Sequence, residues 1–443
     1  MKYQIITFGC QMNSADSLWL DTALTCRGHQ QTQAAEEADF FIVNTCSVRE
    51  KPEQKVYSLL GRLRDYHDQD SRVFVCVGGC VAQQAGRTFL ERFPFVRLVF
   101  GTDALARVPQ VIEDLEQDPD LKLCILDLQQ KFTERAPLIP INPQPQAFVN
   151  IMQGCDNFCA YCIVPYTRGR QKSRDSSAVI NECRRLAALG TREITLLGQN
   201  VNSYGLDNPE EDLTFTELLE EIAALPGLNR LRFTTSHPKD VSRELIQAFG
   251  RLDALCPALH LPLQSGSDRI LRAMGRGYTS GQYLEIINRL RQVRPDITLT
   301  TDLMVGFPGE TQEDFEQTLA VMDSIGYDSS FSFRYSDRPG VRAASMEPKV
   351  SLEVKTRRLN TLQKLQQDWT RRKLESRVGI EDSVLILGPS KKQKPGACSW
   401  TGKDSGGRTV NIDFNTQDDQ TGKLVRVVFT RAGKHSLEGE LLP

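Results

Sequence analysis

Several common signatures are missing from this sequence of 443 residues. No apolar run approaches the roughly 20 residues that a membrane-spanning helix needs. The first residues, 1–7, lack the basic start and the long apolar stretch of a secretory signal. The formal net charge is only −2, so no overall excess of basic residues marks the chain as a nucleic-acid binder. These absences predict a cytoplasmic protein in which any RNA-binding surface is a local patch.

Internal repeats and low-complexity tracts are missing too. What is present is an ordinary globular composition, with 40% hydrophobic and 25% charged residues. At roughly 150 residues per domain, the length predicts about three domains.

The pattern of apolar runs divides the chain into three regions. Residues 1–118 alternate apolar runs with helical stretches, which predicts a doubly wound parallel sheet. Residues 119–140 are rich in proline and are expected to form a linker. Residues 141–374 repeat the alternation with six candidate strands, which favours a partial (β/α)6 barrel over a closed barrel of eight units. Residues 375–443 hold short strands between polar turns, which predicts a small all-β barrel.

The expected strands can be stated by number. They are 3–8, 40–43, 73–77 and 96–100 in the first region, 148–152, 193–197, 231–235, 259–263, 298–304 and 330–335 in the second, and 384–387, 410–414, 424–429 and 437–441 in the third.

The first functional signal is a set of three cysteines, Cys155, Cys159 and Cys162, directly after the first strand of the second region. Three thiolates can hold three irons of a 4Fe–4S cube and leave the fourth iron open. An open position distinguishes a reactive metal site from a structural one. A cofactor with an amine and a carboxylate can chelate there, and one electron passed to its sulfonium would give a carbon radical. The alternative is a structural zinc or a closed cluster, but no second cysteine hook or histidine pair follows.

A second set, Cys10, Cys46 and Cys80, is spread widely along the first region. Each of these cysteines follows a predicted strand. Because the ends of parallel strands meet at one edge of a sheet, we expect the three thiols to converge. The glycines before Cys10 and Cys80 suit tight turns beside a bulky ligand. The set predicts a second cluster with an open iron; the alternative is three unrelated buried cysteines.

The other six cysteines are expected to be structural. They are Cys26 and Cys183 in helical patterns, Cys76 and Cys124 in strand-like runs, and Cys256 and Cys398 in loops.

Polar and small residues also gather at the predicted strand ends of the second region. Ligands in open β/α folds bind beyond these ends, where amides and hydroxyls can hold ribose or carboxylate groups. Ordinary turns are the alternative, and for the histidine in the set a structural role is as plausible as a catalytic one. No catalytic residue is assigned beyond the cluster ligands. The candidates are Gly198, Gln199, Asn200, His237, Gln264, Ser265, Gly306 and Glu310.

Two basic runs are candidate RNA contacts, since Lys and Arg on phosphates make binding salt-dependent. A solvated loop is the alternative for each run. The aromatic residues Phe158, Tyr161 and Tyr166 are candidates for stacking on a base pulled from an RNA loop. The basic candidates are Arg168, Arg170, Lys172 and Arg174 in one run and Lys391, Lys392 and Lys394 in the other.

The C-x3-C-x2-C motif, with Tyr161 before its last cysteine, resembles the signature of the radical S-adenosylmethionine superfamily. The resemblance implies a partial β/α barrel and places S-adenosylmethionine against the strand-end loops. Along its whole length, the chain is also similar to the methylthiotransferases, and in detail to the bacterial tRNA 2-methylthio-N(6)-dimethylallyladenosine synthases. The stretches that carry this likeness are 8–13, 44–49, 153–170 and 197–205. Gly275, Asp337, Val341 and the tail at 391–400 depart from the family pattern.

The resemblance implies domains, cofactors and partners. The domains would be an N-terminal cluster domain, a radical core and a C-terminal, OB-like RNA-binding barrel called TRAM. The cofactors would be two 4Fe–4S clusters and S-adenosylmethionine. The expected partners are a tRNA anticodon stem-loop, a reductant such as flavodoxin or ferredoxin, and cluster-assembly proteins, with no membrane and a monomeric state.

The implied reaction is methylthiolation of carbon 2 of N(6)-dimethylallyladenosine next to the anticodon, with two S-adenosylmethionine molecules consumed. An unactivated C–H bond resists acid–base chemistry but yields to a radical. One alternative is a sibling methylthiotransferase acting on threonylcarbamoyl-adenosine or on a ribosomal-protein aspartate. The other is an iron–sulfur protein that binds RNA without catalysis.

Overall fold

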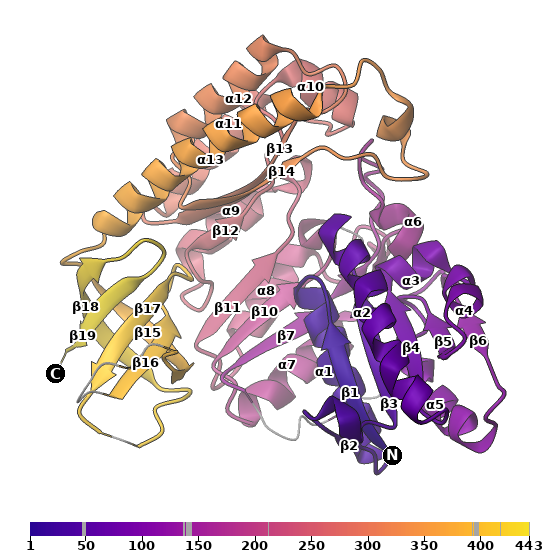
Figure 1. Cartoon of the computed structure of the whole chain (residues 1–443). Coiled ribbons are helices and arrows are strands. Elements are labelled where there is room, and N and C mark those ends of the chain that lie inside the picture. Colours follow the sequence, from indigo (N-terminus) through magenta and orange to yellow (C-terminus); the bar gives the residue numbers. More distant parts are fainter. Residues whose placement is uncertain are drawn as a thin grey trace.

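The computed structural model describes residues 1–46, 50–135, 138, 144–210, 212–391, 393, 398–416 and 418–442. An N-terminal α/β domain, a central partial barrel with a long helix, and a small C-terminal barrel follow one another along the chain (Figure 1). Ser47, Val48 and Arg49 of the stretch 44–49, Pro137 and Pro140 of the predicted linker, and Lys392 and Lys394 of the second basic run lie outside the described residues. In the described ranges, no helix has the length and apolarity needed to cross a membrane.

The N-terminal domain is a parallel sheet with the strand order β2-β1-β3-β4-β5-β6. Its strands are β1 (Lys2–Thr7), β2 (Gln30–Gln31), β3 (Phe40–Thr45), β4 (Phe74–Gly79), β5 (Val96–Phe100) and β6 (Leu123–Ile125). Its helices are α1 (Gln11–Cys26), α2 (Glu50–Gln69), α3 (Cys80–Ala85), α4 (Thr88–Arg92) and α5 (Val108–Gln117), with 3-10 turns η1 (Ala35–Glu37) and η2 (Leu105–Arg107).

Helices cover both faces of this sheet, so the predicted doubly wound arrangement is confirmed. The central strands β3 and β4 are buried along their whole length, because apolar side chains on both of their faces meet a helix layer. One apolar cluster joins the sheet to α1 and α5, and the other joins it to α2, α3 and α4. The strand order reverses between β1 and β3, which is where ligands bind in sheets of this kind.

The sheet has two strands more than the sequence predicts. The strand β2 is only two residues long, and β6 is a three-residue edge strand within the predicted linker. Both are too short to show a period of alternating burial. The domain therefore extends to Ile125, beyond the predicted boundary at residue 118.

The central region contains the six predicted strands, in two parallel sheets ordered β11-β10-β7 and β12-β13-β14. An isolated bridge pairs Leu231 of β11 with Leu255, which precedes the first strand of the second sheet. The partial barrel is confirmed. The strands are β7 (Gln146–Asn150), β10 (Glu193–Leu197), β11 (Arg230–Thr234), β12 (Ala258–His260), β13 (Thr298–Val305) and β14 (Ser329–Arg334), and β8 (Met152–Gln153) and β9 (Lys172–Ser173) form a small antiparallel pair.

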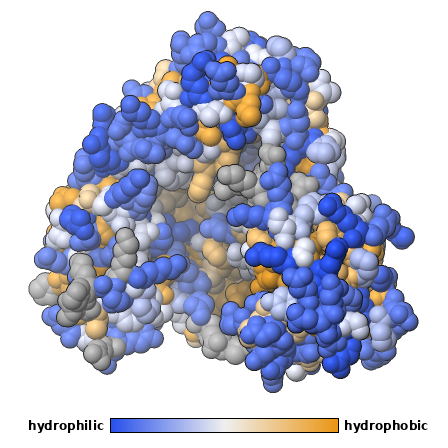
Figure 2. All heavy atoms as spheres, in the orientation of Figure 1, coloured by the Kyte–Doolittle hydropathy of each residue, from blue (hydrophilic) through white to orange (hydrophobic). Residues whose placement is uncertain are grey.

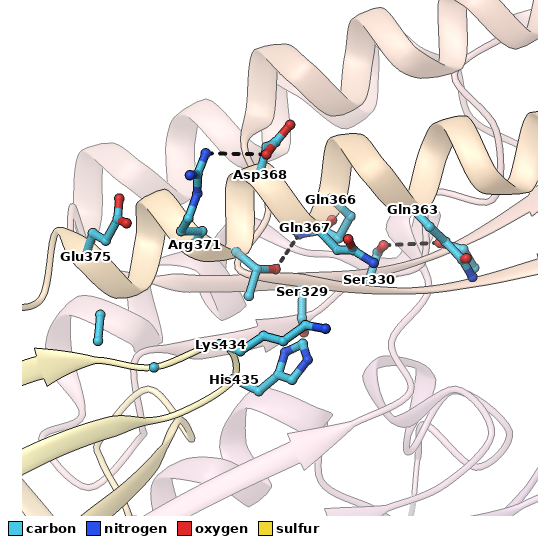
Figure 3. A pocket seen from close by; sticks show the side chains of 14 residues that line it. Ser329, Ser330, Gln363, Gln366, Gln367, Asp368, Arg371, Glu375, Lys434 and His435 are labelled. Atoms are coloured by element: carbon cyan, nitrogen blue, oxygen red, sulfur yellow. Dashed lines mark hydrogen bonds and ion pairs between the residues drawn. The ribbon is translucent and has the colours of Figure 1, made fainter.

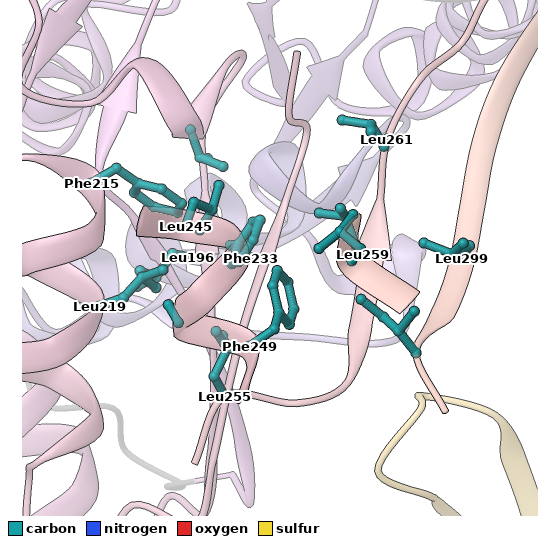
Figure 4. Close-up of a cluster of buried hydrophobic side chains, with 14 of the residues drawn as sticks. Leu196, Phe215, Leu219, Phe233, Leu245, Phe249, Leu255, Leu259, Leu261 and Leu299 are labelled. Atoms are coloured by element: carbon teal, nitrogen blue, oxygen red, sulfur yellow. The ribbon is translucent and has the colours of Figure 1, made fainter. Parts of the chain in front are cut away.

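Helices pack against the outside of these strands and bury leucine and phenylalanine side chains (Figure 4). Thr214, Thr279 and Thr311 start three of the helices with capping boxes, in which side chain and backbone satisfy each other. The helices are α6 (Val164–Arg168), α7 (Ser176–Ala188), α8 (Phe215–Ala223), α9 (Arg243–Arg251), α10 (Asp268–Met274), α11 (Ser280–Val293), α12 (Gln312–Ile325) and α13 (Leu352–Glu375), with 3-10 turns η3 (Val201–Ser203), η4 (Pro238–Asp240) and η5 (Arg342–Ser345).

Helix α13 packs against β14 and leads into a closed barrel with the order β15-β16-β17-β19-β18. The all-β prediction is confirmed. The strand β16 was not predicted, and Cys398 lies in it rather than in a loop. The strands are β15 (Glu381–Pro389), β16 (Cys398–Lys403), β17 (Thr409–Phe414), β18 (Leu424–Ala432) and β19 (Leu437–Leu441).

The turn between β16 and β17 docks on the end of the central barrel at which strands begin. Arg230, at the start of β11, donates to the Lys403 carbonyl at 2.7 Å. Arg232 donates to the carbonyls of Asp404 and Ser405 at 3.0 and 2.8 Å. Arg408 reaches back from the turn to Asp328 at 2.7 Å. Because these charged groups are largely buried, the two barrels are held in a defined relation.

Candidate metal and cofactor centres

The N-terminal thiols lie at one edge of the first sheet, as predicted. Cys10 precedes α1 directly after β1, Cys46 follows β3, and Cys80 is the first residue of α3 after β4. Cys46 and Cys80 are only 3% and 4% exposed, whereas Cys10 is open to solvent. These are the strand ends on either side of the point where the strand order reverses.

Glycine allows the loops that carry these cysteines to touch. A Cβ atom on Gly9 would stand 2.6 Å from Cβ of Cys46, and one on Gly79 would stand 2.2 Å from the Thr45 carbonyl oxygen. Both glycines also have positive φ angles, 144° and 89°, which side chains disfavour. The contacts bring the loops of all three cysteines together.

Two buried asparagines connect the same loops, and the sequence reasoning did not identify their role. Asn13 donates to the Asn44 side chain at 2.8 Å and to the Thr45 carbonyl at 3.0 Å. Asn44 donates in return to the Asn13 carbonyl and to Ser17, both at 3.0 Å. Thr45 then donates to the carbonyl of Gly78 at 2.5 Å. The sequence does place an asparagine close to each of the first two cysteines, Asn13 after Cys10 and Asn44 before Cys46, and this could have indicated their role.

The N-terminal thiols lie close to one another and to the positive charge of Arg168. Although the residue is exposed, neighbouring groups partly desolvate the Cys10 thiol, which favours its neutral form. A hydrogen bond with Cys46 and the positive charge of Arg168 outweigh this effect and lower the pKa of Cys10 to about 5. Burial disfavours the charge of Arg168, but the nearby Cys80, Asp16 and Cys10 outweigh it and hold the arginine pKa above its usual value. Thiolate is the form that binds iron, so this setting favours ligation at Cys10.

The second set of thiols lies in the loop between β8 and α6. Cys155 donates its backbone N–H to Gly169 at 3.2 Å, and Cys162 donates to the Cys159 carbonyl at 2.9 Å. Burial raises the pKa of Cys162 to about 12, and the neighbouring Cys159 adds to that shift. Cys155 and Cys159 are 9% and 8% exposed. The loop therefore presents three enclosed thiols beyond the end of the first barrel strand.

A buried arginine that the sequence reasoning passed over supports this loop. Arg276 donates to Sγ of Cys159 and to the Tyr161 hydroxyl, both at 3.4 Å, and to the Pro262 carbonyl at 3.1 Å. It also donates to the Tyr278 hydroxyl at 3.1 Å. Its pKa is well above the usual value, because the nearby tyrosine and thiol groups outweigh desolvation.

Three residues other than glycine have positive φ angles among the described residues: Phe158 (43°), Thr235 (70°) and Gln264 (67°). Phe158 lies within the cysteine loop, and the other two follow β11 and β12. Conformations of this kind are costly and gather at functional sites. Their positions mark the strand-end side of the barrel as the site.

The predicted strand-end residues surround the same loop, with different roles. Gln199 accepts a hydrogen bond from the Gly154 N–H at 2.6 Å and also contacts Met12 of the N-terminal domain. Asn200 donates to Asp240 at 2.7 Å. Gly198 leaves room for Met152, whose Cγ would be 2.4 Å from a Cβ atom at that position. These contacts bring β8 and the loop after β10 together.

His237 is 5% exposed and stays neutral, because burial lowers its pKa to about 2. Its Nδ1 atom accepts from the Lys239 N–H at 3.3 Å, and its backbone N–H donates to Asn202 at 2.8 Å. Its Nε2 atom is buried without a hydrogen-bond partner, as are Oδ1 of Asn200 and Oγ of Ser236. Buried polar atoms are normally paired. The three open atoms fit a site that receives a polar ligand.

The remaining strand-end candidates make hydrogen bonds within the fold, and their cofactor-binding role stays a prediction. Ser265 lies 3.3 Å from the Thr318 hydroxyl of α12. Glu310 accepts from the Gly306 N–H and from Arg358 of α13, both at 2.6 Å, and burial raises its pKa. Oε1 of Glu310 has no partner. Gln264 is 8% exposed and accepts from the Met304 N–H at 2.9 Å through its own carbonyl.

The basic run at 168–174 differs from expectation. Lys172 and Asp103 form a buried ion pair, and Arg174 pairs with Glu134 at 3.0 Å and with Glu182 at 2.7 Å. Arg168 is 4% exposed. The structure therefore does not present these three side chains to a phosphate. Arg168 and Lys172 reach the N-terminal domain, and Arg174 joins the segment at Glu134 to α7. Arg170 alone of the four is exposed, and it pairs with Asp156 at 2.6 Å.

Two aromatic candidates are open to solvent beside the cysteine loop. Phe158 and Tyr166 are 44% and 51% exposed, and their ring centroids are 6.3 Å apart. The guanidinium of Arg170 lies 5.4 Å from the Phe158 ring centroid. Tyr161 instead points inward to Arg276. In the C-terminal barrel, Lys391 is exposed, while Lys392 and Lys394 lie outside the described residues.

The molecule is hollowed between the N-terminal domain, the upper helices and the C-terminal barrel, and hydrophobic residues show at depth (Figure 2). A cavity of about 300 Å³ lies within the central barrel. Its wall includes Gln11 next to Cys10, the inner side chains Phe148 and His260, and Gly406 and Gly407 of the C-terminal barrel. All three domains therefore border one space.

A larger, polar cavity of about 820 Å³ lies elsewhere, between β14, α13 and the turn that connects β18 and β19 (Figure 3). Gln363, Arg371, Lys434 and His435 line it. It contains none of the cysteines.

Each cysteine set offers three thiols, the ligand type of iron–sulfur clusters. In the described ranges, no three acidic, histidine or cysteine side chains stand close enough to hold one metal ion directly. A cube is wider than a single ion, and thiolates are its usual ligands. Burial raises the pKa values of Cys76, Cys183 and Cys256, as expected of structural cysteines. Cys76 and Cys183 lie within apolar clusters, whereas Cys256 has the charged groups of Arg232 and Glu193 nearby.

Comparison with known proteins agrees with the geometry. Residues 149–322 match the model of the radical SAM superfamily, and residues 2–101 match that of uncharacterized protein family UPF0004. The fold resembles the cobalamin-dependent radical enzyme OxsB with a TM-score of 0.55, at 12% identity over 83% of this chain and 56% of that chain. It resembles the methyltransferase TsrM from Kitasatospora setae with a TM-score of 0.54, at 14% identity over 90% of this chain and 77% of that one. The fold and the matched superfamily model define a radical S-adenosylmethionine enzyme.

Full-length relatives specify the family. The tRNA-2-methylthio-N(6)-dimethylallyladenosine synthase of Oleidesulfovibrio alaskensis is 54% identical over 99% of this chain and 98% of its own length. The synthases of Geobacter metallireducens and Geobacter sulfurreducens are 48% and 45% identical, over 99% and 100% of this chain and 97% and 98% of their own lengths. The chain belongs to the tRNA-2-methylthio-N(6)-dimethylallyladenosine synthase family.

Proposed function

We propose that the chain methylthiolates carbon 2 of N(6)-dimethylallyladenosine next to the anticodon of tRNA, with two S-adenosylmethionine molecules and two 4Fe–4S clusters. Cys10, Cys46 and Cys80 hold one cluster. The other is held by Cys155, Cys159 and Cys162. The observation that carries the proposal is that both thiol sets, on different domains, face the strand-end side of one partial barrel and are connected through Gln199, Met12 and Arg168.

The two sets suit different tasks. The thiols of the barrel set are supported by Arg276, and the unpartnered atoms of Asn200, Ser236 and His237 lie in the loops after β10 and β11 of the same barrel. Those atoms can hold the ribose or carboxylate of S-adenosylmethionine. The cluster with that cofactor supplies one-electron cleavage, which an unactivated C–H bond requires. Cys10 of the other set is open to solvent, where sulfur can be exchanged.

Exposed residues near the barrel cysteines and in the C-terminal barrel suit contact with RNA. Phe158 and Tyr166 can stack on an unpaired base, and Arg170 beside them can contact a phosphate. Lys391 offers a further contact from the C-terminal barrel. A reductant such as flavodoxin or ferredoxin is expected to feed the barrel cluster.

The test is reconstitution with iron and sulfide under anaerobic conditions, followed by dithionite, S-adenosylmethionine and isopentenylated tRNA. Nucleosides are then digested and analysed by mass spectrometry. We expect a methylthio-adenosine product that is lost in Cys159→Ala and, separately, in Cys46→Ala. Cys26→Ala, an exposed cysteine outside both sets, should keep full activity.

The outcomes distinguish the alternatives. Deoxyadenosine without modified base would support the barrel cluster and point to another substrate. Neither product from protein with full iron would contradict an enzyme function and favour an RNA-binding iron–sulfur protein.

A further inference from the structure

Arg168 belongs by sequence to the loop of the barrel cysteines but reaches the other thiol set. It is the last residue of α6, and α6 packs against α3, which begins with Cys80. The preceding residue, Thr167, accepts a hydrogen bond through its carbonyl from Thr102 of the N-terminal domain at 3.1 Å. The side chain of Arg168 is therefore buried between two domains, beside Cys80 and Cys10.

The guanidinium of Arg168 has the thiols of Cys80 and Cys10 and the carboxylate of Asp16 as neighbours. The nearby carboxylate of Asp16 is already paired with Arg135 at 2.8 Å. Among the basic residues at 168–174, Lys172 and Arg174 are in ion pairs with acidic groups, and Arg170 pairs with Asp156. Two or three thiolates on the N-terminal side form a concentrated negative charge for which Arg168 is the neighbouring cation.

One terminal nitrogen of Arg168, Nη2, is buried and has no hydrogen-bond partner among the described residues. A buried charged donor without a partner is costly. By contrast, Arg276 at the barrel set uses its nitrogens on Pro262, Tyr278, Tyr161 and Cys159. Nη2 of Arg168 is therefore placed to donate a hydrogen bond to an anion beside the N-terminal thiols.

We propose that Arg168 is a positioning residue of the N-terminal centre, where its guanidinium stabilises the reduced cluster and donates a hydrogen bond to a sulfur anion, sulfide or methanethiolate. This inference rests on the proposed function, in which Cys10, Cys46 and Cys80 hold a cluster with an open iron. In this proposal, the segment that carries the barrel cysteines also supplies a residue to the N-terminal centre.

The test uses the full chain with Cys155, Cys159 and Cys162 replaced by alanine, so that spectroscopy reports the N-terminal cluster alone. In this parent we compare Arg168→Met, which removes the charge, Arg168→Lys, which keeps it, and Arg170→Met, an exposed control on the same loop. The readouts are iron content, the midpoint potential from a redox titration followed by electron paramagnetic resonance, and the Kd of methanethiolate from its effect on that signal.

We expect Arg168→Met to shift the midpoint potential to a more negative value, because loss of a positive charge destabilises the reduced cluster. We expect its methanethiolate Kd to rise at least about tenfold, as for loss of a charge-assisted hydrogen bond. Arg168→Lys should keep the potential and bind methanethiolate with intermediate affinity. Arg170→Met should match the parent in potential and Kd.

Unchanged potential and Kd in Arg168→Met with full iron would overturn the role of Arg168 and leave the cluster assignment in place. If Arg168→Met fails to retain iron, the role of Arg168 is judged from Arg168→Lys instead. Weaker methanethiolate binding by Arg168→Lys than by the parent would support the role. Binding equal to that of the parent, or loss of iron, would overturn it. A parent without iron would overturn the assignment of Cys10, Cys46 and Cys80 itself, which is a different failure.

Discussion

Small residues around the N-terminal thiols control how closely the three loops approach one another. Gly9 and Gly79 stand where a side chain would collide with the next loop, and Asn13 and Asn44 fasten the loops from inside. The cysteines supply ligands, but these neighbours decide whether the thiols converge.

Gly9→Ala should prevent assembly of the N-terminal cluster, because the new Cβ atom would stand 2.6 Å from Cβ of Cys46. We expect loss of about half of the iron bound by the reconstituted protein, with deoxyadenosine formation at the barrel cluster retained. The control is Gly28→Ala, since Gly28 also has a positive φ angle of 86° but has open space around it. Full iron in Gly9→Ala would contradict the steric explanation.

His237 predicts a dependence of stability on pH. Its folded pKa lies far below the ordinary 6.5, so the unfolded chain binds an extra proton once the pH falls below that value. The stability that this histidine contributes is therefore present above pH 6.5 and declines below it, by about 1.4 kcal/mol per pH unit. Urea unfolding of the wild type and His237→Asn between pH 7.5 and 5, roughly the range of histidine titration, should show a difference of this slope. Parallel curves would show that His237 becomes protonated in the folded state.

Among the elements, α13 is fastened to the functional edge of the barrel by a buried ion pair. Arg358 of α13 donates to Glu310, whose carboxylate also holds the Gly306 N–H after β13. The glutamate that the sequence places near the cofactor thus shapes the loop after β13.

Arg358→Met should destabilise the protein by about 3–5 kcal/mol, because it leaves the carboxylate of Glu310 buried without its partner. The double variant Glu310→Gln with Arg358→Met should recover part of this loss. Free energies of unfolding from urea titration measure both. If Arg358→Met is as stable as the wild type, the carboxylate of Glu310 must become protonated or hydrated with little loss of stability.

The elements also show what sequence patterns can and cannot predict. The six barrel strands could be predicted because each is a run of apolar residues. The positions of the N-terminal cysteines after strands could be predicted for the same reason, whereas their role as cluster ligands stays a prediction. The strand β16 was missed because its six residues include Ser399, Gly402 and Lys403 and so lack a clear apolar alternation.

Gly275 departs from the family pattern but ends α10 in a left-handed conformation, with φ 72° and ψ 38°. Asp337, also atypical, pairs with Lys349 at 2.6 Å.

The burial of Lys172 and Arg174 was beyond sequence reasoning for a different reason. Their partners, Asp103, Glu134 and Glu182, come from different parts of the chain. A basic run looks the same whether it faces solvent or another domain. The pattern of charges within one segment therefore does not reveal contacts between segments.

At the scale of the whole molecule, the three domains form one working unit around the hollow. The N-terminal domain meets the barrel through Gln153, which donates to Thr102 at 3.0 Å and to Asp103 at 2.5 Å. The C-terminal barrel meets it through Arg230 and Arg232. RNA bound to the C-terminal barrel would therefore lie at a defined distance from the thiols.

Gly406→Leu should release the C-terminal barrel, because a Cβ atom on Gly406 would lie 2.3 Å from Oγ1 of Thr298. We expect faster proteolysis near residues 376–380, where α13 meets β15, and a larger radius of gyration in small-angle scattering. Gly388→Leu in β15 is the control, since nothing lies within 4 Å of a Cβ atom there. Equal proteolysis of the two variants would show that the turn tolerates displacement.

The position of Arg168 has a consequence for biosynthesis. Residues 2–125 form a contiguous sheet domain, which can fold while the rest of the chain is still being made. Its thiols would then be exposed without the arginine that later lies beside them. Iron loaded at that stage would occupy an unfinished centre, and the ribosome would need to add the barrel loop before the N-terminal centre reaches its final electrostatic state.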